Sequence, residues 1–492
     1  MILKSPVRVI LELTDRCNHA CVYCFNSCSP SQDVLRELNT IQWKEIIKKL
    51  ADMEVFEISF TGGEPFIRED IFELLEYANK LGFDITINTN ASLLDKNKIR
   101  KLKKIFGKKS NLVRIMVSLD TLDPETYREL SDSRTKLDII LKNIRLLIEF
   151  GFKVTITSIL TSKTTEDYPH LLNFFLKSKL KYWNISGILP YGRGKQPGEF
   201  NASKEDWKKI TKLLRDNENN IISHHKKVSV QTNIFEDTKK ELVNTNEGCF
   251  KCPAGKTEIS IGPKGELNPC IAFRGLKKQE IFIDKLTAYW KKDALMNNLR
   301  NRRADFLMSV CSLCNLKDAC LGGCPGLALR YFNSINMPDP RCPLLPKVEN
   351  ISHNNNFTNF ILNITKSNMK KYYSSWKDMD KEMKDGFLKS NVRTWLLKEK
   401  NQNMGYLMFE EKNKEIFIIS LQIGKKFQHR GYGALMLKKL ENYALEKKFK
   451  KIEFQVKKLN TNAIDFYEKE NYEKIGGNKD YIFFEKILVP VQ

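Results

Sequence analysis

Residues 17–24 read CNHACVYC, so three and then two residues separate Cys17, Cys21 and Cys24. The motif follows the apolar, β-branched run 7–13, which has the composition of a strand. Three thiolates can bind three irons of an iron-sulfur cube, which normally takes four cysteines. The fourth iron then needs a ligand from elsewhere in the chain or a small molecule. Taken alone, the triplet also fits half of a zinc site or small buried side chains.

Strand and helix patterns alternate over the first 235 residues. Amphipathic segments such as 41–53 and 71–81 separate six apolar runs: 7–13, 55–61, 84–89, 113–119, 153–160 and 182–189. This alternation predicts parallel strands joined by right-handed helical crossovers, an α/β fold. In such folds the functional loops follow the carboxyl ends of the strands, and the cysteine motif follows the first run.

The cysteine motif, with Tyr23 just before its third cysteine, resembles that of the radical SAM enzymes. The resemblance implies a partial (β/α)6 TIM-like barrel whose [4Fe-4S] cluster is held by Cys17, Cys21 and Cys24. It also implies that S-adenosylmethionine chelates the open iron through its amino and carboxylate groups. Reductive cleavage of that cofactor would give a 5'-deoxyadenosyl radical, which abstracts hydrogen from a substrate.

Further S-adenosylmethionine contacts are implied by position along the runs. The second run ends in TGGEP, where Gly62, Gly63 and Glu64 match the family motif for the amino group. The resemblance implies that Asn90, Ser118 and Asp120 contact the methionine and ribose portions, and that Arg134 contacts the carboxylate. Tyr23, the aromatic residue of the motif, is also expected at the cofactor. Asp120 has an alternative role as a helix cap near Pro124, and the loop 189–194 resembles one that closes over the adenine.

Two side chains near the motif have no assigned function. Cys28 matches no family ligand and is expected to be a bystander thiol. His19 is expected to be a solvated loop residue, with a hydrogen-bonding role beside the cluster as the alternative.

Eight more cysteines form a second pattern, in which Gly265 stands five residues before Cys270. Their spacing resembles the SPASM extension of radical SAM enzymes. By this analogy a first auxiliary cluster uses Cys249, Cys252, Cys270 and Cys324, and a second uses Cys311, Cys314, Cys320 and Cys342. A zinc ribbon is the alternative. Sulfatase-maturing relatives carry an aspartate base after the hairpin cysteine; this chain has Ile271 and Ala272, so no general base is assigned.

A second fold type is predicted after the cysteines. Proline followed by an asparagine-rich stretch indicates a linker at 346–356. Beyond it, a strand, a glycine-containing turn and the helix 435–447 expose backbone N–H groups suited to pyrophosphate. This arrangement resembles the acetyl-CoA loop of the α+β GNAT acetyltransferases, and the implied cofactor contacts are Gln428, Gly431, Gly433, Ala434 and Asn460.

Tyr467 matches the GNAT position that protonates the departing coenzyme A thiolate. A tyrosine packed in a helix is the alternative. Glu410, Glu411 and Glu415 could include a base for the acceptor amine, but solvated strand ends explain them better.

Composition bounds these assignments. The chain has 492 residues, a formal charge of +23 and 12 cysteines, with no signal peptide and no apolar run of membrane-spanning length. We therefore expect a cytoplasmic protein whose cysteines are metal ligands rather than disulfides. The lysine-rich segment 96–109 fits a helix with a solvated face better than an anion-binding patch.

The expected domains are a radical SAM barrel (1–235), a SPASM auxiliary-cluster domain (236–345), a linker (346–356) and a GNAT domain (357–492). The leading hypothesis is a maturase of ribosomally made peptides whose GNAT domain acetylates an amine. It requires a reductant such as ferredoxin or flavodoxin, and a separate peptide-recognition protein, because only about six residues precede the first strand. Two alternatives are a tRNA-modifying enzyme, which the basic charge favours slightly, and an iron-sulfur scaffold with only the acetyltransferase active.

Overall fold

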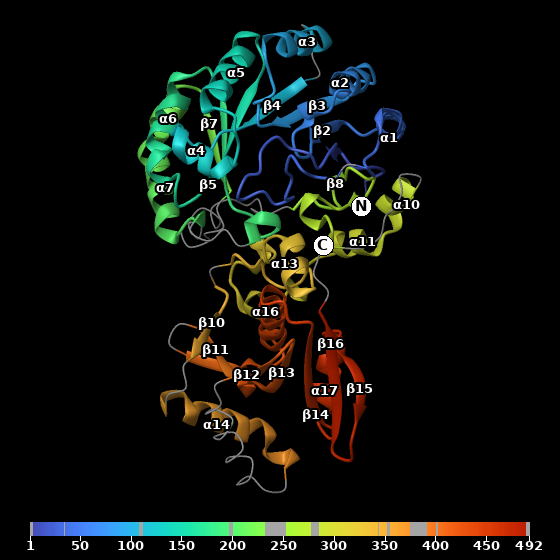
Figure 1. Ribbon diagram of the computed structural model, residues 1–492, viewed down its shortest axis with the longest axis vertical. Coiled ribbons are helices and arrows are strands. Elements are labelled where there is room, and N and C mark those ends of the chain that lie inside the picture. Colours follow the sequence, from blue (N-terminus) through green and yellow to red (C-terminus); the bar gives the residue numbers. More distant parts are fainter. Residues whose placement is uncertain are drawn as a thin grey trace. The chain divides into compact units, whose positions relative to one another are not determined.

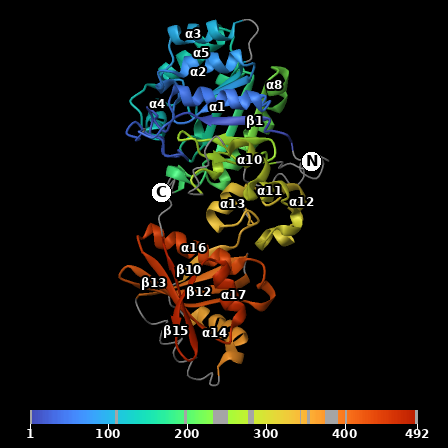
Figure 2. The same cartoon turned by 90° about the vertical axis from the view of Figure 1, so that its right-hand side faces the viewer.

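The computed structural model describes residues 3–33, 35–107, 112–195, 200–231, 252–276, 285–342, 344–351, 355–373, 391–399 and 402–488. The chain divides into two compact units, residues 1–302 (unit 1) and 303–492 (unit 2). Each unit is described by itself (Figures 1 and 2).

Unit 1 is built on a nine-stranded sheet in the order β7-β6-β5-β4-β3-β2-β1-β8-β9. Every neighbouring pair except β8 and β9 is parallel. The strands are β1 (Arg8–Glu12), β2 (Glu57–Thr61), β3 (Asp84–Thr89), β4 (Leu112–Ser118), β5 (Val154–Leu160), β6 (Tyr182–Gly187), β7 (Lys227–Gln231), β8 (Glu258–Ile261) and β9 (Leu267–Asn268).

Helices connect successive strands and cover one side of this sheet (Figure 1). They are α1 (Thr40–Asp52), α2 (Ile71–Lys80), α3 (Lys96–Phe106), α4 (Pro124–Ser131), α5 (Leu137–Glu149) and α6 (Tyr168–Lys177), followed by α7 (Lys204–Asp216), α8 (Glu218–Ser223), α10 (Leu286–Lys292) and α11 (Ala294–Arg300). Local sequence fixes their starts: Asn39 forms a capping box with Gln42 at α1, and Asp95 caps α3.

The two faces of the sheet differ in chemistry. Leu11 and its partner Phe60 belong to the apolar core beneath the helices. The alternate positions carry polar residues: Glu12 pairs with Thr61, and Ser59 pairs with Thr86. Because side chains alternate between faces along a strand, one face packs against helices and the other presents polar groups to a ligand.

The predicted α/β barrel class and its six strands are confirmed. Each of the six runs forms a strand whose ends lie within two residues of the expected ones. The sheet is wider than six strands, because β7 joins beside β6 and the short strands β8 and β9 join beside β1. The lysine-rich segment forms the predicted helix, α3, in which Ile99, Leu102 and Phe106 are buried; Ile105, expected on the apolar face, is only partly buried.

Unit 2 holds a seven-stranded sheet in the order β10-β11-β12-β13-β14-β16-β15. Its strands are β10 (Lys347–Ile351), β11 (Val392–Glu399), β12 (Gln402–Lys412), β13 (Glu415–Ile423), β14 (Lys451–Lys457), β15 (Glu473–Gly477) and β16 (Tyr481–Ile487). Helix α14 (Asn355–Met369) packs on one side of the sheet, and α16 (Tyr432–Glu446) and α17 (Thr461–Lys469) pack on the other (Figure 1).

The segment between the cysteines and the sheet is not a simple connector. Residues 347–351, expected within a linker, form β10 and pair with β11. The short helices α12 (Lys317–Cys320) and α13 (Pro325–Phe332) precede it, and Ala328, Phe332 and Met337 share one core with β11 to β14 and α16. The later cysteines and the second sheet therefore fold as one body.

In the described part of the chain, no helix combines the length and the apolar character needed to cross a membrane.

We expect Trp183→Phe to lower the stability of unit 1. Trp183 is fully buried, stacks on Tyr168 with ring centroids 5.6 Å apart, and donates its indole N–H to Ser158 Oγ at 2.8 Å. Loss of this buried donor should reduce the free energy of unfolding by about 1–3 kcal/mol, measured by denaturant titration. Tyr182→Phe is the matched control, because Tyr182 is exposed and should change stability little; an equal loss in both variants would contradict the prediction.

Candidate active sites

The three cysteines of the motif converge at the carboxyl end of β1. Burial, together with the charges of Glu64 and Cys24, raises the pKa of Cys17 to about 12. Burial also raises the pKa of Cys21, and Cys17 and Cys24 raise it further. Thiols that perturb one another in this way suit a polynuclear cluster, whose positive iron would stabilise the thiolates.

The cysteine loop offers three thiols, the ligand type that iron-sulfur clusters take. In an iron-sulfur cube each cysteine binds a different iron, so its sulfurs stay further apart than the ligands of a single zinc. The donor set therefore fits the predicted cluster.

Two glycines hold the cysteine loop by main-chain contact. Gly63 N–H donates to Thr14 O at 2.7 Å, and Glu64 N–H donates to Arg16 O at 2.9 Å. A Cβ on Gly62 would meet Thr14 O, and one on Gly63 would overlap Arg16 O. The GG pair is thus required by the close approach of two backbones.

Glu64 and Asn90 lie together beside the cluster loop. Glu64 is fully buried, and its carboxylate accepts hydrogen bonds from Phe66 N (3.0 Å), Thr89 Oγ1 (2.8 Å) and Asn90 N (2.7 Å). Burial raises the pKa of Glu64 to about 7. Asn90 Nδ2 approaches Cys17 Sγ at 3.8 Å, so the ends of β2 and β3 both reach the motif.

Of the three cofactor contacts expected at or after the end of β4, one is buried in a hydrogen-bond network and two are exposed. Asp120 is buried, accepts Ile159 N at 2.7 Å and hydrogen-bonds the Tyr23 hydroxyl, so it joins the cysteine loop to β5. It does not cap α4, because that role falls to Asp123, whose side chain accepts Thr126 N. Ser118 is exposed at the end of β4, and Arg134 is exposed in the turn after α4.

One of the two expectations about the loop's neighbours changes. His19 is buried rather than solvated, with 4% of its surface exposed. Its Nε2 lies 3.5 Å from the Tyr127 hydroxyl, its backbone N–H faces Cys17 Sγ at 3.4 Å, and burial lowers its pKa to about 4. Cys28, which is assigned no iron, is buried, and its thiol donates to Asp15 Oδ1 at 4.0 Å.

Arg193 is a site residue that sequence reasoning did not single out. Its side chain donates to Cys21 O at 2.8 Å and Cys28 O at 2.6 Å, and its N–H donates to Cys24 O at 3.0 Å. Gly192 has φ +59° and packs where a Cβ would overlap Phe25 O. The Gly-Arg-Gly sequence after β6 thus holds the cysteine loop, and an arginine between two glycines was its only local signal.

Several of the later cysteines are thiols whose pKa is raised. The pKa values of Cys320 and Cys342 are raised by burial and by neighbouring thiols, with Cys314 acting on both. Cys324 is the N-cap residue of α13 without a side-chain capping hydrogen bond, and burial raises the pKa of its thiol as well. The predicted split, in which Cys324 serves a different cluster from its neighbours, stays a prediction.

The four cysteines predicted for the first auxiliary cluster are far apart in the sequence. Cys252 and Cys270 belong to unit 1 and Cys324 to unit 2, while Cys249 lies outside the described residues. Disulfide bonds join none of the eleven described cysteines to one another. Within unit 2, Asp339 orders the loop between Cys324 and Cys342: its carboxylate accepts Cys324 N at 3.1 Å and binds the Arg341 guanidinium.

Unit 2 contains a cavity of about 1340 Å³ beside α16 and α17. All six GNAT residues expected from the sequence line it: Gln428, Gly431, Gly433, Ala434, Asn460 and Tyr467. Gly431 begins α16 with φ +80°, so the first N–H groups of a 15-residue helix open toward the cavity. Asn460 caps α17 by accepting Ala463 N at 3.3 Å.

The central strands part beside this cavity. β13 and β14 pair over only three positions, from Glu415–Lys451 to Phe417–Glu453, although both strands continue further. The following segments, 418–423 and 454–457, line the cavity and do not pair with each other, while each stays paired with its other neighbour, β12 or β16. Backbone groups left unpaired by this divergence can bind an extended ligand such as the pantetheine arm of acetyl-CoA.

Tyr467 and one of the three candidate glutamates lie at this cavity. Tyr467 stacks on Phe454, with ring centroids 4.2 Å apart, and burial raises its pKa above the ordinary value. Glu410 lines the cavity. Glu411 and Glu415 are not among the residues that line the cavity. Glu411 instead pairs with Arg393, and Glu415 lies 3.3 Å from Lys451 Nζ.

Comparison with known proteins agrees with this geometry. The radical SAM superfamily pattern matches residues 11–175, and that of the acetyltransferase (GNAT) family matches residues 361–472. Mycofactocin maturase MftC of Mycolicibacterium smegmatis is 26% identical over 349 residues, which cover 69% of this chain and 83% of MftC. PqqA peptide cyclase of Bradyrhizobium diazoefficiens is 22% identical over 353 residues, covering 70% and 88%.

Solved structures point the same way. Streptococcus suis SuiB bound to S-adenosylmethionine superposes with a TM-score of 0.56 and 25% identity, over 70% of this chain and 78% of SuiB. The chain therefore carries a radical SAM domain, with SPASM-type peptide maturases as its homologues, followed by a GNAT acetyltransferase domain.

Proposed function

We propose that the protein is a radical SAM/SPASM maturase that modifies a ribosomally made peptide and acetylates an amine from acetyl-CoA. The observation that carries the first half is the convergence of Cys17, Cys21 and Cys24 on a loop held by two glycines and Arg193. The bound [4Fe-4S] cluster supplies the electron that cleaves S-adenosylmethionine. The protein's own residues hold the loop, bury the thiols and surround the cofactor.

Each polar residue near the loop has a defined task in this proposal. Glu64 is positioned to accept the cofactor's ammonium while it holds Asn90 and Thr89 in place. Asp120 fixes Tyr23, and the exposed Ser118 remains available to the ribose or methionine portion. Arg134 is a carboxylate ligand only if its exposed turn moves inward when the cofactor binds.

A peptide substrate is supported by the relatives. MftC is a maturase, PqqA peptide cyclase acts on a peptide, and SuiB has been solved with its precursor peptide SuiA. We further propose two auxiliary clusters on the eight later cysteines, an external reductant such as ferredoxin or flavodoxin, and a separate peptide-recognition partner. A cytoplasmic location fits, because thiolate-bound clusters need a reducing compartment.

The second half of the proposal rests on the cavity of unit 2. The start of α16 would bind the pyrophosphate of acetyl-CoA, and the parted strands would bind its pantetheine arm. Attack of an amine on the thioester breaks the carbon-sulfur bond, and the Tyr467 hydroxyl gives its proton to the departing thiolate. Glu410 is placed at the same cavity to receive a proton from the amine.

We expect Cys24→Ala to remove the reactive cluster. The variant should lose about four irons per chain and form no 5'-deoxyadenosine from S-adenosylmethionine under dithionite. Anaerobic iron counting and chromatography of the nucleoside products measure both effects. Cys28→Ala should keep its iron, because Cys28 is assigned no iron; full 5'-deoxyadenosine formation by Cys24→Ala would exclude the proposed site.

We expect Tyr467→Phe to reduce acetyl transfer by about 10²-fold or more in kcat, the range for loss of a general acid. The assay follows release of the coenzyme A thiol from acetyl-CoA with water or an added amine as acceptor. Burial raises the Tyr467 pKa, so its hydroxyl stays protonated and the activity should not fall between pH 7 and pH 10 through this group.

The control for this substitution is Tyr472→Phe. Tyr472 is equally buried and packs on Phe454, but it donates to Glu441 and does not line the cavity. Its variant should keep kcat even if stability falls. Equal kcat in the two variants would assign Tyr467 to packing.

A further inference from the structure

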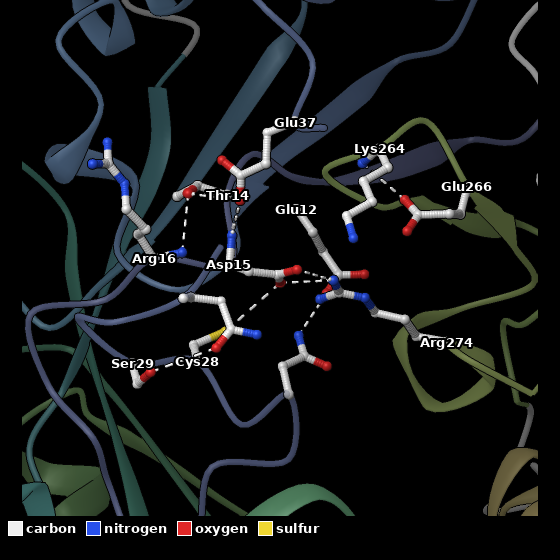
Figure 3. Close-up of polar contacts among 12 residues, drawn as sticks. Glu12, Thr14, Asp15, Arg16, Cys28, Ser29, Glu37, Lys264, Glu266 and Arg274 are labelled. Atoms are coloured by element: carbon white, nitrogen blue, oxygen red, sulfur yellow. Dashed lines mark hydrogen bonds and ion pairs between the residues drawn. The ribbon is translucent and has the colours of Figure 1, made fainter. Parts of the chain in front are cut away.

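Arg274 ties the hairpin of Cys270 to the strand and turn that lead into the cysteine loop (Figure 3). Its Nη2 donates to both carboxylate oxygens of Asp15, at 2.6 and 2.8 Å, and its Nη1 donates to Glu12 Oε2 at 3.1 Å. Arg274 stands four residues after Cys270, and Asp15 two residues before Cys17. The contact therefore joins the expected auxiliary-cluster segment to the expected S-adenosylmethionine cluster within unit 1.

The contact continues to a cluster ligand. The Cys28 thiol donates to Asp15 Oδ1 at 4.0 Å, and the Cys28 side chain also neighbours that of Cys24. Asn26, from the same loop, donates its Nδ2 to Glu12 Oε2 at 2.6 Å. Figure 3 shows Asp15 between the guanidinium and the thiol. A continuous path thus runs from Arg274 through Asp15 and Cys28 to Cys24.

The charged side chains in this path are largely buried, and two negative charges face one positive charge. Side-chain exposure is 15% for Arg274, 1% for Glu12 and 11% for Asp15. One guanidinium faces two carboxylates, and Glu12 Oε1 has no hydrogen-bond partner among the residues that the structure describes. Charges at such sites are weakly screened, so they act on neighbouring groups more strongly than surface charges do.

We propose that Arg274, Asp15 and Cys28 are positioning residues that set the reduction potential of the cluster at Cys17, Cys21 and Cys24. Cluster potentials depend on nearby charge, on hydrogen bonds to the sulfurs and on exposure. Arg274 stabilises the added electron, Asp15 opposes it, and the Cys28 thiol, whose single proton faces Asp15 Oδ1, separates that negative charge from the sulfur of Cys24. Through this path the segment that carries Cys270 acts on the cluster that starts the radical reaction. The inference rests on the proposed cluster site.

The test measures the potential in full-length, anaerobically reconstituted protein. The variants are Arg274→Met, Asp15→Asn, Cys28→Ala and the double variant Asp15→Asn/Arg274→Met. Redox titration follows one electron paramagnetic resonance signal, the signal that changes when S-adenosylmethionine is added. That change distinguishes this cluster from any other cluster in the protein. Iron is counted in every sample.

Opposite shifts are expected from the two charged residues. Arg274→Met should lower the ratio of reduced to oxidised cluster about tenfold at a fixed potential, equal to about 59 mV for one electron. Asp15→Asn should raise that ratio by a similar factor, and the double variant should return close to the parent value. Cys28→Ala should lower the ratio by a smaller factor.

Arg300→Met is the matched control. Arg300 also belongs to unit 1 and donates to backbone carbonyls, Gly255 O at 2.7 Å and Trp290 O at 2.6 Å, neither of them in the cysteine loop. It should leave the potential unchanged. Should Arg274→Met fail to fold, Asp15→Asn and the charge-balanced double variant still decide the question.

Equal potentials in all variants, or shifts of one sign accompanied by iron loss, would overturn the inference and leave the network a structural role. Failure of the proposed function looks different: the parent protein would then bind no cluster that responds to S-adenosylmethionine.

Discussion

The main-chain contact between the GG turn and the cysteine loop is the constraint on which unit 1 depends. Gly63 lies against Arg16 O so closely that no side chain fits between them. This contact places the ends of β1 and β2 side by side and turns the loop over the polar edge of the sheet. Arg193 then holds the loop by its carbonyl groups. Backbone contacts thus hold the loop that carries the thiols.

Local signals in the sequence predicted most of the fold. β-Branched runs gave six strands within two residues of their ends, because parallel strands buried on one face need those residues. The residues proposed to bind acetyl-CoA were predicted from a strand, a glycine turn and a helix that lie close together in sequence, and the structure places them around one cavity. The charged strand β10 was missed, because KVENI has no apolar pattern and is defined by its pairing with β11.

The other features that the sequence did not predict depend on contacts that the local sequence does not mark. Arg274 and Asp15 are 259 residues apart, and nothing in either local sequence marks the pair. His19 sits in a polar loop, yet Tyr127 of α4 covers it, so its burial is decided by a distant helix. Cys28 matched no ligand pattern and gains its contact to Cys24 only when the loop folds back on itself.

The core of unit 2 bears on how this protein can be divided for experiments. Ala328, Phe332 and Met337, which lie among the later cysteines, pack with the strands and helix that form the acetyl-CoA cavity. A truncation at the boundary of the GNAT match, near residue 361, would remove β10 and expose that apolar surface to water. Expression of the acetyltransferase as a separate soluble product therefore calls for a start near residue 303, which brings the second cysteine group along with it.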